Sequence, residues 1–582
     1  MKNILRNSIL VGCLSVLGAC TDLQEVVLDE SFTGSGLSET ISGAIAPAYG
    51  QISSTWRHTN YYGLQLLASD EAILPHRGGT DWFDGGKFLA AHTHSITPTN
   101  DLVTTSWVEL TRNISRALTA IETLRPLAEN GNAEAQGALY EMIALRGYLN
   151  MLMLDSWGVV FRKETSLETS EILRGQDAVD YIASEFMSVV DVINTDRGPG
   201  RMTQSAVWGF LARLHLNAAV YRDPYGTPDF TQQDMDRVIE YTTNVIESGQ
   251  YALSPEYFAL FNDENHENRE LIFALDQRGV LEQEHSRWTY WSLAGSLWGR
   301  PEYPSSDGTD GPAITPDFYR TWTEAYDVDP AEADNRFYMR NQQIPEELRD
   351  LTGFTPANDA DHYYCTTAEE YEFDRGIIRG VIWGPRKDEN GAFLRCDGDP
   401  NEYRIYPVIQ IKGNGPDRDV AYVDHELQVD FTNEGRLHSK GYRVSKYQFS
   451  RTSPNANDFS SIDLVLMRPA EMYLMRAEAR LRTGDGAGAL EDVNFVRTSR
   501  TAREPVPAAL ESVDLDTLFR ELGFEFYWEG LRRTNQIRFG RYEDSWTEKT
   551  DSDPQNRLFP IPQSAIDGAS NTPGYLQQNA GY

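Results

Sequence analysis

Residues 468–500, RPAEMYLMRAEARLRTGDGAGALEDVNFVRTSR, have the pattern of a helical hairpin. Pro469 suits the first turn of a helix, and apolar residues such as Met472 and Met475 recur at helical spacing. The glycine-rich segment 484–488 interrupts this pattern, and a second helical run follows it. Two helices joined by a short turn have about the length of a tetratricopeptide repeat, although the full tetratricopeptide signature is absent.

Two further segments have the periodicity of amphipathic helices. They are GALYEMIALRGYLNMLMLDSWG, residues 137–158, and QSAVWGFLARLHLNAAVY, residues 204–221. The middle of the chain differs, because it is rich in Gly, Pro, Asp and aromatic residues and contains short strand-like pieces such as YRVSKYQF. We therefore expect a mostly α fold, with a tetratricopeptide-like helical hairpin scaffold and a large loop-rich region containing small β elements. The expected parts are an N-terminal helical part at 41–270, the loop-rich insert at 271–460 and a C-terminal helical part at 461–582.

The N-terminus has the layout of a secretory signal peptide. Lys2 and Arg6 precede a short apolar run that ends at Ala19. This run is too short to cross a bilayer, which takes roughly 20 apolar residues. The sequence therefore predicts a cleavage site here and no membrane-spanning helix.

The residues Leu-Gly-Ala-Cys at 17–20 resemble a lipoprotein cleavage box. We expect residues 1–19 to be removed as a lipoprotein signal peptide and Cys20 to carry acyl chains such as palmitate. The polar and acidic residues 20–40 then form a lipidated tether. An ordinary signal peptide with a chance cysteine is the alternative.

The composition argues against nucleic acid as a partner. The chain has 87 acidic and 52 basic residues, a formal net charge of −35, and such a field repels polyanions. There is no C-x2-C or H-E-x-x-H pattern, so the sequence predicts no zinc site and no other cofactor.

After export and lipidation, Cys365 and Cys396 would be the cysteines that remain. A leftover pair in an exported protein is a disulfide candidate. Chain entropy suggests that a loop of this length contributes roughly 3–4 kcal/mol when closed. Two free thiols are the alternative.

Three C-terminal segments together resemble the SusD/RagB family of outer-membrane nutrient-binding lipoproteins. They are RPAEMYLMRAEARLRTGD with the following ALEDVNFVR, RELGFEFYWEGLRRTNQIRFG, and LFPIPQSAID with the closing YLQQNAGY. Upstream segments such as ARLHLNAAVY and GTDGPAITPDFYRTW are also similar to the family, so the resemblance covers about residues 40–582. One departure is Asn535, where the family more often has Asp, which puts one local ion pair in doubt.

The resemblance implies a surface-exposed, lipid-anchored protein of the outer membrane that captures a nutrient, commonly an oligosaccharide. The implied partner is a TonB-dependent, SusC-like outer-membrane barrel that imports the ligand. No catalysis is implied, and the sequence has no G-x-S-x-G elbow, phosphate-binding glycine loop or zincin motif. The alternatives are a helical-repeat scaffold for protein interactions and an anchored glycoside hydrolase that uses two carboxylates.

Aromatic side chains beside polar groups are the chemistry that binds a sugar ring. The segment SRWTYWSLAGSLWGRPEYP, residues 286–304, contains Trp288, Tyr290, Trp291 and Trp298, from which we expect ligand contact. The three tryptophans are also spaced as a buried helical stripe would be, so burial is the alternative.

A second candidate is RGGTDWFDGG, residues 77–86, in which glycines flank Trp82 and Phe83. Flanking glycines favour an exposed loop tip, so we expect these two residues to contact the ligand. The polar neighbours of the two aromatic segments are Asp81, Asp84, Arg287 and Arg300.

Glu521, Glu525 and Glu529 would share one face of a helix. Like charges at this spacing are destabilising unless they are paired, and Arg532 and Arg533 are within reach of Glu529. We interpret the group as a structural ion network and not as a catalytic carboxylate set.

Two other charged segments have both a structural and a functional interpretation. CDGDPNE offers Asp397, Asp399, Asn401 and Glu402 to calcium, although a solvated acidic turn is the favoured interpretation. A basic stretch could receive an anionic sugar or partner, but a strand with a solvated basic edge is the default. Its residues are Arg436, Lys440, Arg443, Lys446 and Arg451.

Overall fold

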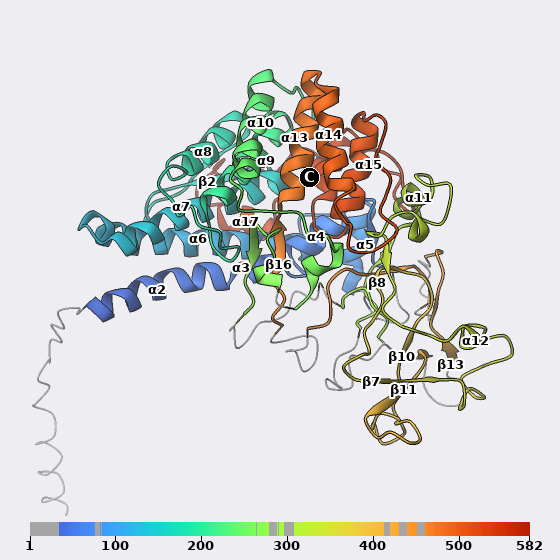
Figure 1. Cartoon of the computed structure of the whole chain (residues 1–582). Coiled ribbons are helices and arrows are strands. Elements are labelled where there is room, and N and C mark those ends of the chain that lie inside the picture. The colour runs from blue at the N-terminus through green and yellow to red at the C-terminus, as the bar shows by residue number, and fades with distance from the viewer. Residues whose placement is uncertain are drawn as a thin grey trace, which may run out of the picture. The chain divides into compact units, whose positions relative to one another are not determined.

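The computed structural model describes residues 34–75, 82, 84–263, 265–278, 288, 290–295, 308–412, 419–429, 439–450 and 460–582. Most of the regular structure in these residues is helical (Figure 1). The helices of the first half are α2 (Gly34–Gly50), α3 (Ile52–Thr55), α4 (Tyr61–Leu67), α5 (Lys87–His92), α6 (Asp101–Glu129), α7 (Ala133–Trp157), α8 (Gly175–Met187), α9 (Gln204–Arg222) and α10 (Gln232–Glu247). Those of the second half are α11 (Pro316–Thr323), α12 (Glu346–Arg349), α13 (Pro469–Thr483), α14 (Gly486–Arg497), α15 (Leu515–Phe526), α16 (Arg532–Arg538) and α17 (Gln563–Gly568).

The long helices α6 and α7 form the first hairpin, and each starts at an asparagine cap. The Asn100 side chain accepts a hydrogen bond from the Leu102 amide, and Asn132 accepts one from the Ala135 amide. Gly158 ends α7 in the left-handed conformation, with φ of 65°. Almost every residue in the second half of α7 is buried, because α6, α8 and α9 pack around it.

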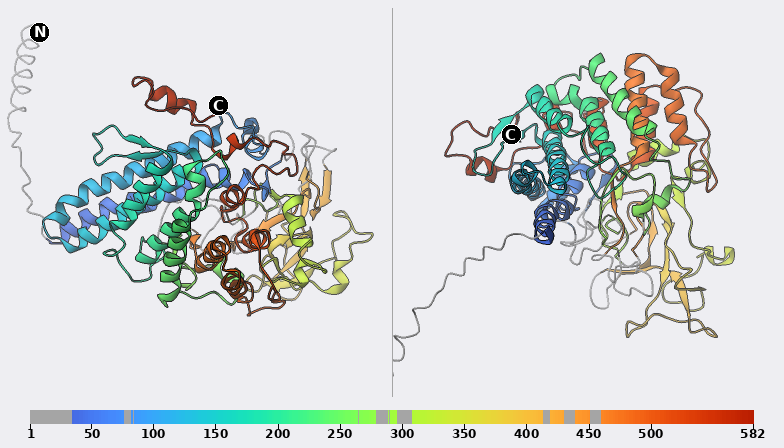
Figure 2. Two further views of the ribbon diagram at one scale, coloured as in Figure 1. Left: turned by 90° about the horizontal axis from the view of Figure 1, so that it is seen from above. Right: turned by 60° about the vertical axis from the view of Figure 1, so that its left-hand side comes forward.

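The hairpin predicted from residues 468–500 is present as α13 and α14. Pro469 is the first residue of α13, and Gly484 ends the helix with φ of 92°. The Asp485 side chain caps α14 by accepting from the Gly488 amide. Figure 2 shows α13 and α14 side by side, and α13 also packs on α10. The prediction of a mostly α fold built from helical hairpins is confirmed.

The strands are short and mostly come from the middle of the chain. They are β1 (Ala72–Ile73), β2 (Val160–Arg162), β3 (Glu171–Leu173), β4 (Phe273–Leu275), β5 (Ala313–Ile314), β6 (Tyr338–Met339), β7 (Tyr364–Thr367), β8 (Arg375–Ile378), β9 (Gly380–Val381), β10 (Trp383–Pro385), β11 (Glu402–Pro407), β12 (Ile409–Lys412), β13 (Asp419–Tyr422), β14 (Asp424–His425), β15 (Arg443–Ser445) and β16 (Leu464–Met467). They pair antiparallel in small sheets, of which β10-β11-β7 and β15-β8-β6 have three strands. The bounds of the three predicted parts stay predictions.

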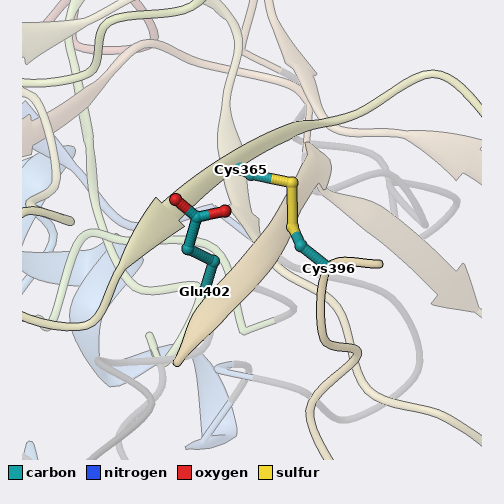
Figure 3. A group of neighbouring side chains, drawn as sticks. All are labelled: Cys365, Cys396 and Glu402. Atoms are coloured by element: carbon teal, nitrogen blue, oxygen red, sulfur yellow. A yellow bond between two sulfur atoms is a disulfide. The ribbon is translucent and has the colours of Figure 1, made fainter. Parts of the chain in front are cut away.

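A disulfide joins Cys365 on β7 to Cys396, with the two sulfur atoms 1.95 Å apart (Figure 3). On the central strand of this sheet, β11, Arg404 pairs with Cys365 across the ladder. The residues on either side of Arg404, Tyr403 and Ile405, face the opposite way, into an apolar core that includes Trp383 of β10.

The structure describes the last residues of the predicted tether. Residues 34–40, which we expected to belong to the tether, form the first turns of α2. Cys20, the predicted signal peptide 1–19 and the rest of the tether lie outside the described residues. Among the residues that are described, no helix is both long and apolar enough to span a bilayer.

A buried ion network joins the helical part to the middle of the chain. Its basic members are Arg336, Lys446, Arg468, Arg497 and Arg500, and its acidic members are Glu270, Asp334, Glu521, Glu525 and Glu529. The Arg468 guanidinium is hydrogen-bonded to Glu270 at 2.9 Å, Glu525 at 2.6 Å and Glu529 at 2.9 Å. Arg500 binds the same Glu270 and Glu525. The predicted role of the glutamates as a structural network is confirmed.

The predicted partners of Glu529 were wrong. Arg532 pairs with Asp70 and Arg533 with Asp155, whereas Glu529 pairs with Lys446 and Arg468. Both Arg532 and Arg533 begin α16, after a sharp turn at 527–531 that the helical spacing did not reveal.

The predicted strand with a solvated basic edge is also corrected. The strand exists as β15, but Arg443 and Lys446 are buried. Burial lowers the pKa of Lys446 to about 8, although its ammonium lies 2.6 Å from Glu529. Lys440 pairs with Glu426, while Arg436 and Arg451 lie outside the described residues.

Replacing Glu525 with Gln should destabilise the fold by about 3–5 kcal/mol, because it leaves Arg336, Arg468 and Arg500 buried without one of their shared counter-charges. The denaturant midpoint of the purified protein measures this. The matched control is Asp516→Asn on the same helix, whose side chain is 75% exposed, and its effect should stay below about 1 kcal/mol. Equal midpoints for the two variants would contradict a stabilising network.

Candidate functional site

Trp82 lies over a cluster of aromatic rings and is itself half-buried. Its ring centroid is 5.8 Å from Phe88, 6.0 Å from His58 and 6.2 Å from Trp291. The indole N–H donates to the backbone oxygen of Thr309. A tryptophan that is fixed at its N–H and partly open on its ring is suited to stack on a ligand.

The backbone that presents Trp82 is in an unusual conformation. Trp82 has φ of 53° and Asp84 has φ of 44°, a region that side chains with a Cβ rarely adopt. Gly85 and Gly86, with φ of 68° and 82°, complete the turn at no steric cost and lead into α5. Such strain concentrates at functional sites, where the surrounding structure maintains it.

Beneath Trp82, the aromatic cluster continues into the core. Trp288 stacks on Tyr62 with centroids 3.9 Å apart, and its indole N–H donates to the Trp56 backbone oxygen at 2.8 Å. The cluster draws its rings from α4, α5 and residues 288 and 291, which are far apart in the sequence. Trp291 contacts both Tyr62 and His58.

Three of the aromatic residues predicted in segment 286–304 are described, and all three are buried. Trp288 is 5% exposed, and Trp291 and Tyr290 are each 1% exposed. Burial was the alternative for the two tryptophans, although they lie in turns and not on a helical stripe. Tyr290 packs against Phe449 in the separate apolar core of the middle region. Trp291 thus supports Trp82 from below, Trp288 stacks on the neighbouring Tyr62, and neither forms an exposed platform.

Several other predicted site residues lie outside the described residues. They are Phe83, Trp298, Asp81, Arg287 and Arg300. Asp84 is described and exposed, and its carboxylate lies 3.6 Å from the Lys87 ammonium at the start of α5. An exposed carboxylate and a half-buried ammonium beside an aromatic face can bind the hydroxyl groups of a sugar.

A buried carboxyl group that the sequence did not reveal supports this cluster. The Trp528 amide donates to Glu71 Oε1, and the Tyr62 hydroxyl donates to the Trp528 carbonyl at 3.1 Å. Trp528 has φ of 58°, so these two bonds hold a strained turn next to the ring that stacks on Trp288. Glu71 Oε2 meets no hydrogen-bond donor among the described residues, and burial raises the pKa of Glu71 to about 8.

Among the described residues, the two groups of side chains that could hold a metal ion contain residues that are bonded to each other or to neighbouring residues. Cys365 and Cys396 lie near Glu402, but their sulfur atoms are bonded to each other (Figure 3). His266 Nδ1 lies 2.5 Å from Asp463, which is a hydrogen-bond distance, and the Arg278 guanidinium binds the neighbouring Asp276. In the turn considered for calcium, Asp397 pairs with Arg404 and Asp399 accepts from the Asn401 amide.

Comparisons with known proteins agree with the sequence resemblance. The family model described as "SusD family" matches residues 424–582. The starch-binding protein SusD of Bacteroides thetaiotaomicron is 25% identical over 492 residues, which cover 80% of this chain and 75% of that protein.

Solved structures show the same fold over nearly the whole chain. A SusD homolog from Bacteroides thetaiotaomicron has a TM-score of 0.64 at 15% identity and covers 94% of this chain and 97% of its own. The surface glycan-binding protein A from Bacteroides thetaiotaomicron in complex with laminarihexaose has a TM-score of 0.60 at 18% identity, with 93% and 99% covered.

Glu71 should make the stability of the protein fall as the pH rises. Its pKa is raised from its ordinary 4.5 to about 8, so the folded state holds a proton that the unfolded state releases between these values. The stabilisation is complete below pH 4.5 and is lost as the pH rises toward 8. Glu71→Gln keeps an oxygen for the Trp528 amide and has no proton to lose, so at pH 9 it should be more stable than the wild type by roughly 3–5 kcal/mol.

Denaturant midpoints measured from pH 5 to pH 9 test this. Glu267→Gln, which changes a carboxylate that is 79% exposed, is the control and should follow the wild-type curve. Parallel curves for Glu71→Gln and the wild type would show that Glu71 is ionised in the folded protein.

Proposed function

Because the resemblance of this chain to the SusD/RagB family is confirmed, we propose that the protein is a cell-surface lipoprotein that binds an oligosaccharide nutrient. The observation that carries the proposal is the position of Trp82, which is half-buried, held by a strained turn and supported by stacked rings. The starch-binding function in the name of the similar SusD protein and the laminarihexaose complex of the structural neighbour support the ligand class.

The proposed ligand contacts centre on Trp82, with Phe83 and Trp298 as further contacts. An aromatic face covers the C–H side of a sugar ring, and Asp84 and Lys87 are placed to bind its hydroxyl groups. Trp288 and Trp291 act through Trp82, because they are buried beneath it. The identity of the sugar is left to a binding screen that begins with starch- and laminarin-derived oligosaccharides.

The proposed location and partner follow from the family. Cys20 would carry the lipid, and the protein would lie at the outer face of the outer membrane. It would pass its ligand to a TonB-dependent, SusC-like barrel for import. A large barrel encoded by the adjacent reading frame would support this partner.

We propose binding without catalysis. The buried carboxylates of Glu521, Glu525 and Glu529 belong to the ion network, where arginine side chains pair with them. A glycoside hydrolase needs two carboxyl groups that reach a substrate, about 5–10 Å apart. Reducing ends released from a bound oligosaccharide by the purified protein would overturn this part of the proposal.

Replacing Trp82 with Ala should weaken oligosaccharide binding about 10-fold or more, since a central aromatic contact is worth about 2 kcal/mol when truncated. Isothermal titration with the best oligosaccharide of the screen measures the change. Phe495→Ala is the matched control, because Phe495 is 51% exposed on α14 and is not part of the aromatic cluster. The proposal fails if both variants bind as the wild type does.

Replacing Cys20 with Ser should release the protein from the membrane fraction, because the lipid would have no attachment site. Immunoblots of soluble and membrane fractions from cells that express each form measure this. A Cys20→Ser protein that still sediments with membranes and is still labelled at the cell surface would show that the anchor is not a lipid on Cys20.

A further inference from the structure

A second cleft lies in the helical part of the protein, between α8, α9 and α10. It has a volume of about 590 Å³ and is lined mainly by polar side chains. Gln176 and Asp180 come from α8, His215 and Arg222 from α9, and Asp234 and Arg237 from α10. Its lining residues do not overlap with the aromatic cluster around Trp82.

The floor of the cleft is a hydrogen-bonded chain that ends in an arginine. The buried Asp234 carboxylate lies 3.1 Å from His215 Nδ1, and it therefore favours the tautomer with its proton on Nδ1. The other ring nitrogen, Nε2, is then an acceptor, and Arg237 Nη1 lies 3.3 Å from it. Arg237 makes no further hydrogen bond or ion pair among the described residues, so its guanidinium is positioned while most of its donors are unused.

A second arginine is held by the same carboxylate. Arg222 donates to Asp234 at 2.6 Å and to the Gln176 side-chain oxygen at 2.5 Å. Its third nitrogen, Nη1, is shielded from solvent and meets no acceptor among the described residues. An unsatisfied buried donor is unfavourable, and an oxygen of a bound ligand would relieve this cost.

The Asp234 carboxylate on the floor already accepts hydrogen bonds from the protein on both of its oxygens. Asp234 accepts from His215, Arg222 and the Thr231 hydroxyl, the last at 2.6 Å. Burial alone would raise the pKa of Asp234, but these hydrogen bonds lower it to about 2, so the group is ionised. Arg222 Nη1 and the guanidinium of Arg237 therefore keep donors that this carboxylate does not take up.

The rim of the cleft has the opposite charge. Asp180, Asp223 and Asp229 line it, and three carboxylates there disfavour a ligand with several negative charges. The two guanidinium groups favour a single carboxylate, which accepts hydrogen bonds from two directions. The cleft volume leaves room for a body that is larger than the carboxylate itself.

We propose that this cleft binds a small ligand with one carboxylate group, whose oxygens accept from Arg222 and Arg237. The ligand chemistry is shared by a uronic acid and by a small organic acid. This site is separate from the oligosaccharide site at Trp82 and does not depend on it.

Isothermal titration of the intact protein with sodium glucuronate tests the proposal, with sodium lactate and glucose as the comparison ligands. Glucuronate should bind and glucose should not. Binding of lactate as well would identify a general carboxylate site, whereas glucuronate alone would identify a uronic acid site. Absence of binding by both carboxylates would overturn the proposal.

Arg237→Gln should weaken glucuronate binding at least about 10-fold, because it removes one of the two cationic donors. Arg112→Gln, which removes an arginine that is 53% exposed on α6, is the matched control and should bind as the wild type does. Equal binding by the two variants would overturn the site. The methyl ester of glucuronic acid gives a second readout that needs no variant, since it removes the ligand's charge and should not bind.

The Trp82→Ala variant separates this site from the proposed function. It should bind glucuronate normally while it loses oligosaccharide affinity. Loss of glucuronate binding in this variant would overturn the claim of a separate site, and it would leave the proposed oligosaccharide site intact.

Discussion

The fold depends on the pairing of two arginines with the same two carboxylates. Arg468 precedes α13 and Arg500 follows α14, so they lie at the two ends of one helical hairpin, and both bind Glu270 and Glu525. Glu270 leads into β4, which pairs with β16 directly before Arg468. Closing the hairpin therefore also fixes the strand pair and the helix that carries Glu525. A buried charge is tolerated only when its counter-charges are present. The network therefore favours the one arrangement of the chain that pairs all of them.

The same network reaches the candidate site through one short turn. Glu529 pairs with Arg468 and Lys446, and the preceding residue, Trp528, donates its amide to Glu71. Tyr62 binds the carbonyl of Trp528 and stacks on Trp288, which belongs to the rings beneath Trp82. The rigidity of the helical part is thus transmitted to an aromatic surface by hydrogen bonds to a single strained residue. A ligand that stacks on Trp82 meets rings that are already ordered, so that binding orders few side chains.

The sequence predicted the helical elements well because their signals are local. The apolar spacing, the proline at 469 and the glycine at 484 act within one or two turns, and the structure has each of them in its expected role. Partners of charged residues were not predictable in the same way, since Arg532 finds Asp70 more than four hundred residues away. Trp288 and Trp291 were identified as important, but their exposure depends on Tyr62 of α4 and on His58, which pack on them only in the folded chain. No sequence signal pointed to Glu71, because a lone glutamate before a short strand carries no pattern.

The two proposed sites share one arrangement, in which buried groups hold a side chain that is partly open to solvent. At Trp82, buried rings hold an aromatic side chain that is partly open to solvent, and Glu71 holds the Trp528 turn behind these rings. In the cleft between α8 and α10, the buried pair of His215 and Asp234 holds an arginine that is partly open to solvent. In both cases the groups that hold this side chain are buried and are packed or hydrogen-bonded within the protein. The position of the side chain is therefore set before any ligand binds. The exposed group then determines the ligand class, a sugar face for the indole and a carboxylate for the guanidinium. Asn535, where the family more often has Asp, is likewise hydrogen-bonded within the protein. Its amide oxygen accepts from Arg538 at 2.8 Å, and Glu478 supplies Arg538 with the negative charge that an aspartate would have given.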